Sequence, residues 1–103
     1  TIGGTPVEKL SGAKDFIAAY QARWGGGDTL RPYDHYGYEA ANVLIDALAA
    51  AGPDRLKVLE ALRRTKHAGL LGVTTFDEKG DAVGHRAAMT RAQAKDRSFS
   101  SLE

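Results

Sequence analysis

The chain has 103 residues, of which 43% are hydrophobic and 26% are charged, the balance of an ordinary globular domain. Its 14 basic and 13 acidic residues are interspersed and give a net charge of +1, which argues against a nucleic-acid-binding surface. The absence of cysteine excludes disulfides, thiolate nucleophiles and cysteine-ligated metal sites. No apolar run approaches the ~20 residues of a membrane span, and no signal peptide is present in this chain.

The first third of the sequence predicts a turn-rich lead-in followed by an amphipathic helix. Residues 1–6, TIGGTP, show no hydrophobic period and are expected to be loose. Ser11 is the expected N-cap, and residues 25–28, GGGD, are expected to end the helix. Apolar residues between them recur at helical spacing, which predicts a buried face. They are Ala13, Phe16, Ile17, Tyr20 and Trp24.

Residues 31–48, RPYDHYGYEAANVLIDAL, combine a loop rich in aromatic and polar side chains with a second amphipathic helix. The loop, residues 31–36, is the one stretch that concentrates side chains suited to holding a small ligand. A helix that starts there points its free N–H groups toward whatever the loop faces, which favours an anionic group. Gly52-Pro53 is the expected stop. The predicted buried stripe consists of Tyr38, Ala41, Leu44, Ile45 and Leu48.

The last third changes from a helical to a strand pattern. Asp54 can cap a third helix, whose apolar residues recur from Leu56 and whose C-terminal basic cluster we interpret as a solvated helix end. Residues 70–76, LLGVTTF, predict a strand, and residues 77–81, DEKGD, predict a turn with Gly80 in a positive-φ conformation. Residues 83–90 are expected to return as the second strand of a hairpin, and residues 93–103 to form a frayed tail.

Catalytic and metal sites receive little support from the residues. The three histidines, His35, His67 and His85, lie in different predicted elements, and no metal-binding pair or calcium loop occurs. Asp34-His35 could orient an imidazole for acid–base catalysis, but no nucleophile is adjacent in the sequence. No cofactor is expected. An enzyme that uses Asp34 and His35 stays open as an alternative, although binding is favoured.

Four segments, in this order and spacing, resemble a known family. They are residues 16–25, FIAAYQARWG; residues 36–44, YGYEAANVL; residues 50–55, AAGPDR; and residues 70–81, LLGVTTFDEKGD. Together they are similar to the C-terminal part of the type I periplasmic binding proteins of the branched-chain amino acid (leucine/isoleucine/valine-binding) family, the receptors of ABC importers. The resemblance covers roughly residues 7–89.

This resemblance implies that the chain is a C-terminal fragment, residues 1–103, of an extracellular ligand-binding domain. The intact fold would be α/β, with two lobes that close on a ligand about a hinge; this piece alone would be mainly helices plus a β-hairpin. The lobes' parallel strands and the groups that clamp the ligand's carboxylate and ammonium would lie upstream. By position, Tyr33 corresponds to an aromatic that the family places against the ligand side chain. His35 lies two residues further on in the same loop and is the second expected ligand-binding residue.

The expected ligand is a branched-chain amino acid or a similar small molecule, such as an amide or aromatic acid. A tyrosine–histidine loop is more polar than an aliphatic pocket requires, which disfavours leucine. The expected partner is an ABC permease and the expected location is periplasmic or extracellular, with no nucleic acid involved. A sensor domain of a receptor or regulator with the same fold is the alternative. The isolated piece should expose apolar stripes, through which it can self-associate.

Overall fold

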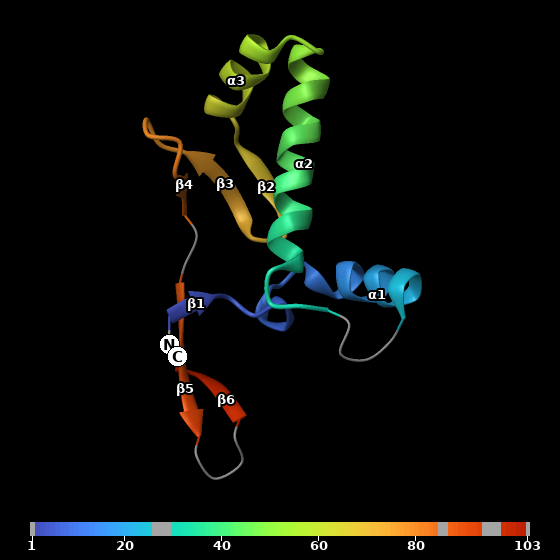
Figure 1. Ribbon diagram of the computed structural model, residues 1–103, viewed down its shortest axis with the longest axis vertical. Coiled ribbons are helices and arrows are strands. Elements are labelled where there is room, and N and C mark those ends of the chain that lie inside the picture. Colours follow the sequence, from blue (N-terminus) through green and yellow to red (C-terminus); the bar gives the residue numbers. More distant parts are fainter. Residues whose placement is uncertain (1, 26–29, 85–86, 94–97, 103) are drawn as a thin grey trace.

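The computed structural model describes residues 2–25, 30–84, 87–93 and 98–102 of the chain. In chain order the elements are β1 (Ile2–Gly4), the 3₁₀ helix η1 (Val7–Lys9), α1 (Ala13–Trp24), α2 (Asp34–Ala51), α3 (Arg55–Arg63), β2 (His67–Gly69), β3 (Gly72–Phe76), β4 (Ala82–Val83), β5 (Ala87–Gln93) and β6 (Ser98–Leu102) (Figure 1). The radius of gyration is 16.2 Å. A compact chain of this length would have a radius of about 13 Å. The molecule is therefore extended.

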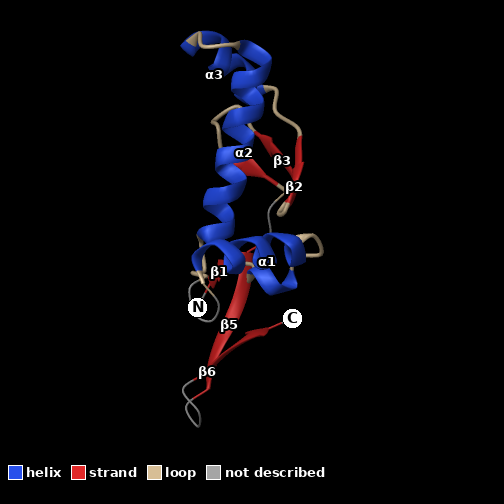
Figure 2. Ribbon diagram, turned by 90° about the vertical axis from the view of Figure 1, so that its right-hand side faces the viewer, coloured by secondary structure: helices blue, strands red, loops and turns tan. Residues whose placement is uncertain are grey.

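The elongation arises because the strands form two separate sheets. β2, β3 and β4 form one antiparallel sheet beside α2 and α3, and we refer to these elements together with α1 as the helical body. β1, β5 and β6 form the other antiparallel sheet, which we refer to as the terminal sheet. In both views the β5–β6 hairpin projects away from the helices (Figures 1 and 2). The chain passes between the two bodies after β1 and again after β4.

The helix ends follow the sequence signals at most positions. α1 stops at Gly25 with φ 98° and α2 stops at Gly52 with φ 71°, so both helices end at a glycine with a positive φ, which other residues rarely adopt. The Asp54 carboxylate accepts hydrogen bonds from the backbone N–H groups of Leu56 and Lys57, which confirms it as the cap of α3. The prediction for Ser11 was wrong, because α1 begins after Gly12 without a side-chain cap.

The buried face of α2 differs from the apolar stripe that the sequence predicts. The buried positions are four residues apart and comprise His35, Glu39, Val43 and Ala47. Leu44, Ile45 and Leu48 instead expose 43–60% of their surface, because the β2–β3 hairpin packs on the other side of the helix. Trp24 is likewise 65% exposed, contrary to the prediction that it belongs to a buried face. The expectation that this piece exposes apolar stripes is confirmed.

The strands also correct the predicted hairpin and the predicted loose ends. The turn at Gly80, with φ 91°, is present, but β4 pairs with β3 through only two residues. The chain then leaves for the terminal sheet, where β5 pairs with both β1 and β6. The lead-in therefore contains a strand rather than a loose segment, and so does the tail. A further short strand, β2, precedes β3 and joins it through a turn at Leu70-Leu71.

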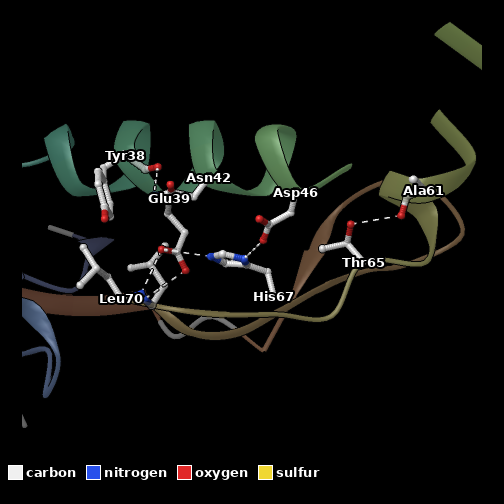
Figure 3. Close-up of polar contacts among 9 residues, drawn as sticks. Tyr38, Glu39, Asn42, Asp46, Ala61, Thr65, His67 and Leu70 are labelled. Atoms are coloured by element: carbon white, nitrogen blue, oxygen red, sulfur yellow. Dashed lines mark hydrogen bonds and ion pairs between the residues drawn. The ribbon is translucent and has the colours of Figure 1, made fainter. Parts of the chain in front are cut away.

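Glu39 fastens that turn to α2. Its side chain is buried, and its carboxylate accepts hydrogen bonds from the backbone N–H groups of Leu70, at 3.0 Å, and Leu71, at 3.4 Å (Figure 3). A Cβ added to Gly69 would collide with this carboxylate, so Gly69 leaves the room that Glu39 occupies. Two backbone N–H groups thus take the place of the water that would otherwise solvate the Glu39 carboxylate. A carboxylate can be buried when such donors replace its water.

His67 extends this attachment along the helix. Its Nδ1 lies 2.8 Å from the Asp46 carboxylate and its Nε2 lies 4.0 Å from the Glu39 carboxylate. Glu39 and Asp46 are seven residues apart, so both side chains leave the same face of α2. The imidazole therefore bridges two turns of the helix and holds β2 parallel to its axis (Figure 3).

We expect Glu39→Gln to destabilise the chain by about 1.5–3 kcal/mol, the usual value of hydrogen bonds to a charged group. An amide offers one oxygen, so one of the two turn N–H groups loses its acceptor. Urea unfolding at low protein concentration, followed by circular dichroism, measures the change. Glu60→Gln, at an exposed position of α3, is the matched control. Equal stabilities of the two variants would contradict the assigned role of Glu39.

We also expect the isolated chain to self-associate through the exposed stripe on α2. Replacing Ile45 and Leu48 with lysine should shift the sedimentation coefficient toward that of a monomer, because two apolar side chains are removed from the exposed surface. Analytical ultracentrifugation measures this shift. A wild-type chain that is monomeric and melts cooperatively would contradict the prediction.

Candidate functional site

The candidate site is the turn that leads into α2. The sequence predicts a loop through residue 36, but the helix begins at Asp34, so His35 and Tyr36 lie in its first turn. Tyr33 is the N-cap residue, and its carbonyl accepts the N–H groups of Tyr36 and Gly37. The expected ligand-binding stretch is therefore shorter and more rigid than a six-residue loop.

Asp34 holds this turn in place. Its carboxylate accepts hydrogen bonds from the Arg31 backbone N–H, at 2.8 Å, and from the Tyr20 hydroxyl of α1, at 2.9 Å. These donors, Arg31 first and Tyr20 second, lower the pKa of Asp34 below its ordinary value. The same hydrogen bond and the negative charge of Asp34 raise the pKa of Tyr20. Asp34 also complements the positive end of the helix dipole, a position that the sequence suggested for a ligand's anionic group.

Tyr33 is the exposed member of the site. It is 67% exposed, and its ring centroid lies 6.0 Å from that of Tyr36 at an angle of 53°. Its backbone is fixed by the turn, while its aromatic face is open to solvent. A rigid backbone with an open aromatic face suits contact with an apolar group of a ligand. That Tyr33 makes such a contact stays a prediction.

His35 lies beneath this surface. It is 0% exposed, its Nε2 lies 3.1 Å from the Thr5 carbonyl, and its Nδ1 has no hydrogen-bond partner among the described residues. Because a carbonyl only accepts, Nε2 carries the proton. The rest of the chain covers the His35 side chain completely. Contact of His35 with a ligand stays a prediction. Asp34 and His35 bond to different partners, so the arrangement lacks the oriented pair that the enzyme alternative requires.

Thr5 is the residue of this region that sequence analysis missed, and Tyr36, although part of the predicted loop, was not expected to bond to it. The Tyr36 hydroxyl accepts the Thr5 backbone N–H at 3.1 Å, so both backbone groups of Thr5 bond to the first turn of α2. The Tyr36 and His35 rings lie 4.4 Å apart. No signal in the aperiodic lead-in indicated Thr5. The aromatic run that precedes the helix was the available signal for Tyr36.

An apolar hollow of 460 Å³ lies between α2, α3 and the β3–β4 strands. Its lining includes Val43, Leu44, Leu62, Leu71 and Phe76. Its polar lining side chains are few, and Glu39 among them already bonds to Leu70 and Leu71. A ligand site needs polar groups that fix orientation, so this hollow is a weaker candidate than the turn at Tyr33.

Other classes of site find no support in the described part of the chain. No group of three or more histidine and acidic residues there is arranged to hold a metal ion. Among the helices that are described, none combines the length and the apolar character that crossing a membrane requires.

Comparison with protein families identifies the chain. The family model described as periplasmic binding protein matches residues 3–97, which is nearly the whole sequence. The chain belongs to the periplasmic binding protein family. This result confirms the resemblance carried by the four sequence segments. No curated protein gives a significant match.

A solved structure shows how much of the fold this chain spans. The chain superposes on a leucine-binding protein of Thermotoga maritima with a TM-score of 0.75 and 27% sequence identity. The superposition covers 99% of this chain but only 29% of that protein. The chain therefore corresponds to part of a type I, two-lobed fold. That this part is the C-terminal one stays a prediction.

The hydrogen bond between Tyr20 and Asp34 predicts a pH dependence with two limbs. The lowered pKa of Asp34 gives stability that is present above about pH 3.9 and is lost as the pH falls through the folded-state pKa. The raised pKa of Tyr20 gives stability that is present below about pH 10 and is lost as the pH rises through its folded-state pKa.

We expect Tyr20→Phe to remove the alkaline limb and to reduce the acid limb of the thermal midpoint. Midpoints measured from pH 2 to 5 and from pH 9 to 11 provide the test. Tyr38→Phe is the control, because the Tyr38 hydroxyl has no hydrogen bond among the described residues. Identical profiles for wild type and Tyr20→Phe would show that this hydrogen bond contributes nothing to folding.

Proposed function

We propose that this chain is part of the extracellular solute-binding component of an ABC importer. That protein binds a branched-chain amino acid or a similar small amino-acid-like or carboxylate ligand between two lobes, and closes about a hinge. The observation that carries the proposal is the exposed, turn-anchored Tyr33 within a chain of the periplasmic binding protein family.

Tyr33 contributes an aromatic contact in this proposal. Its backbone is held by hydrogen bonds within the turn and by Asp34, so little conformational entropy is lost when a ligand packs on the ring. The polar groups that bind the ligand's carboxylate and ammonium belong to segments outside this chain. His35 is the second residue of the proposed site. It lies beneath the surface, where its ring packs against the ring of Tyr36.

The proposed ligand class is that of small amino acids, amides and aromatic acids. The similar solved structure is named as a leucine-binding protein, which favours an amino acid. The tyrosine contact extends the range toward aromatic acids, because aromatic rings stack favourably in offset or tilted geometry. The closed protein would then dock on a membrane permease in the periplasm or at the cell surface.

A ligand-binding sensor domain with the same fold is the second candidate. The family assignment favours both equally, because the same two-lobed closure can be read by a permease or by a signalling segment. A transmembrane or signalling segment in the intact protein would support the sensor.

A thermal-shift screen of the intact protein tests the binding function. Leucine, isoleucine, valine, phenylalanine, acetamide and benzoate represent the proposed classes. A ligand present at ~100 times its Kd should add about 2.7 kcal/mol of stability, which gives a clear rise in the thermal midpoint. We expect one class to give this rise and Tyr33→Ala to abolish most of it.

The matched control is Trp24→Ala, which removes another exposed aromatic ring, at the C-terminal end of α1. It should leave the ligand-induced shift intact. An equal loss in both variants would show that Tyr33 has no specific role. If no ligand class raised the thermal midpoint, the proposed transporter ligands would be contradicted.

A further inference from the structure

The passage between the two bodies is attached to the helix turn that carries Tyr33. Thr5 follows β1 directly and is the first residue after the terminal sheet. Its carbonyl accepts the Nε2–H of His35 and its N–H donates to the Tyr36 hydroxyl, both at 3.1 Å. We refer to this pair of hydrogen bonds as the Thr5 clasp.

The clasp is reinforced by close packing on its β1 side. A Cβ added to Gly4 would lie 2.7 Å from carbon atoms of the Tyr36 ring, so the ring rests directly on the Gly4 backbone. Gly4 is also paired with Ala87 of β5. The Tyr36 ring therefore touches the terminal sheet while its backbone belongs to α2, and one residue spans the junction of the two bodies.

The Thr5 clasp lies where it can constrain the orientation of the terminal sheet relative to the helical body. The β5–β6 hairpin projects away from the helices in both views (Figures 1 and 2), whereas β1 leads directly into the passage at Thr5. A ligand held between lobes contacts groups on both sides, and its affinity depends on how well those groups are preorganised. Fixing Thr5 to the first turn of α2 fixes Tyr33 relative to β1.

We propose that His35 and Tyr36 are positioning residues for ligand binding, which clasp Thr5 at the passage between the two bodies to the turn that carries Tyr33. This inference rests on the proposed function. His35 acts through the Thr5 backbone, so its burial is required by its role. Its Nδ1 takes no part, because the one hydrogen bond that joins His35 to Thr5 runs from Nε2.

The test uses the intact protein and two matched pairs of variants. His35→Gln keeps an amide donor near the position of Nε2, whereas His35→Asn keeps a polar group only near the position of Nδ1. Tyr36→Phe removes the hydroxyl that accepts from Thr5, whereas Tyr38→Phe removes a hydroxyl without a hydrogen bond among the described residues. Calorimetric titration with leucine, phenylalanine and benzoate gives the affinities, and thermal midpoints without ligand report the stability of each variant.

We expect His35→Asn and Tyr36→Phe to weaken binding by about threefold to tenfold, the range that corresponds to one hydrogen bond. His35→Gln and Tyr38→Phe should stay within twofold of wild type. Lower thermal midpoints with unchanged affinities in His35→Asn and Tyr36→Phe would overturn the proposal, because they would show a purely structural role.

Hydrogen exchange separates this inference from the proposed function. Without ligand, the Thr5 amide should exchange faster in Tyr36→Phe and also in His35→Asn, which leaves the amide's own acceptor in place. A wild-type protein that binds none of the three probes contradicts the proposed function. Unchanged exchange in both variants overturns the clasp whether or not the probes bind.

Discussion

The structure depends on one buried carboxylate, that of Glu39. A carboxylate in the interior is costly unless hydrogen bonds replace its water, and here the turn between β2 and β3 supplies two backbone donors. His67 adds a second attachment between the same hairpin and Asp46. These contacts, rather than the apolar stripe of α2, decide which face of the helix the hairpin covers. They also explain why a glycine precedes the turn, where a side chain would displace the carboxylate.

The same helix links the hairpin to the candidate site. α2 runs from the turn at Tyr33 to Gly52. The same helix therefore carries the aromatic residues at its start and the attachment of the hairpin at its middle. Its first turn carries three different roles on consecutive positions. Tyr33 faces solvent, Asp34 bonds back to Arg31 and across to α1, and His35 and Tyr36 hold Thr5. The proposed ligand contact of Tyr33, the bonds of Asp34 and the bonds to Thr5 are thereby concentrated within one helical turn.

The exposed apolar residues lie in a chain that spans only part of the solved structure on which it superposes. The superposition covers 29% of a leucine-binding protein, so most of a two-lobed fold lies outside this segment. Leu44, Ile45 and Leu48 form a helical stripe of the kind that normally packs against a sheet, and here they are open to solvent. Sequence periodicity predicted that this face is buried, and within this chain it is exposed. It could not show that the hairpin of the same chain would choose the opposite face.

The sequence by itself determined the features that depend on local chemistry. The helix ends at Gly25 and Gly52 and the Gly80 turn follow from positive-φ backbone conformations that glycine favours. The Asp54 cap follows from a carboxylate that accepts from the free N–H groups of the first helical turn. The family was also readable from four ordered segments. Tertiary structure alone decided the burial of Glu39 and His35, the strands at both ends, and the bonds to Thr5. Glu39, His35, Thr5 and β1 each depend on a partner about thirty residues or more away, such as Leu70 for Glu39, and no local period records such a contact. β6 pairs with the neighbouring β5, in a tail whose polar sequence shows no strand period.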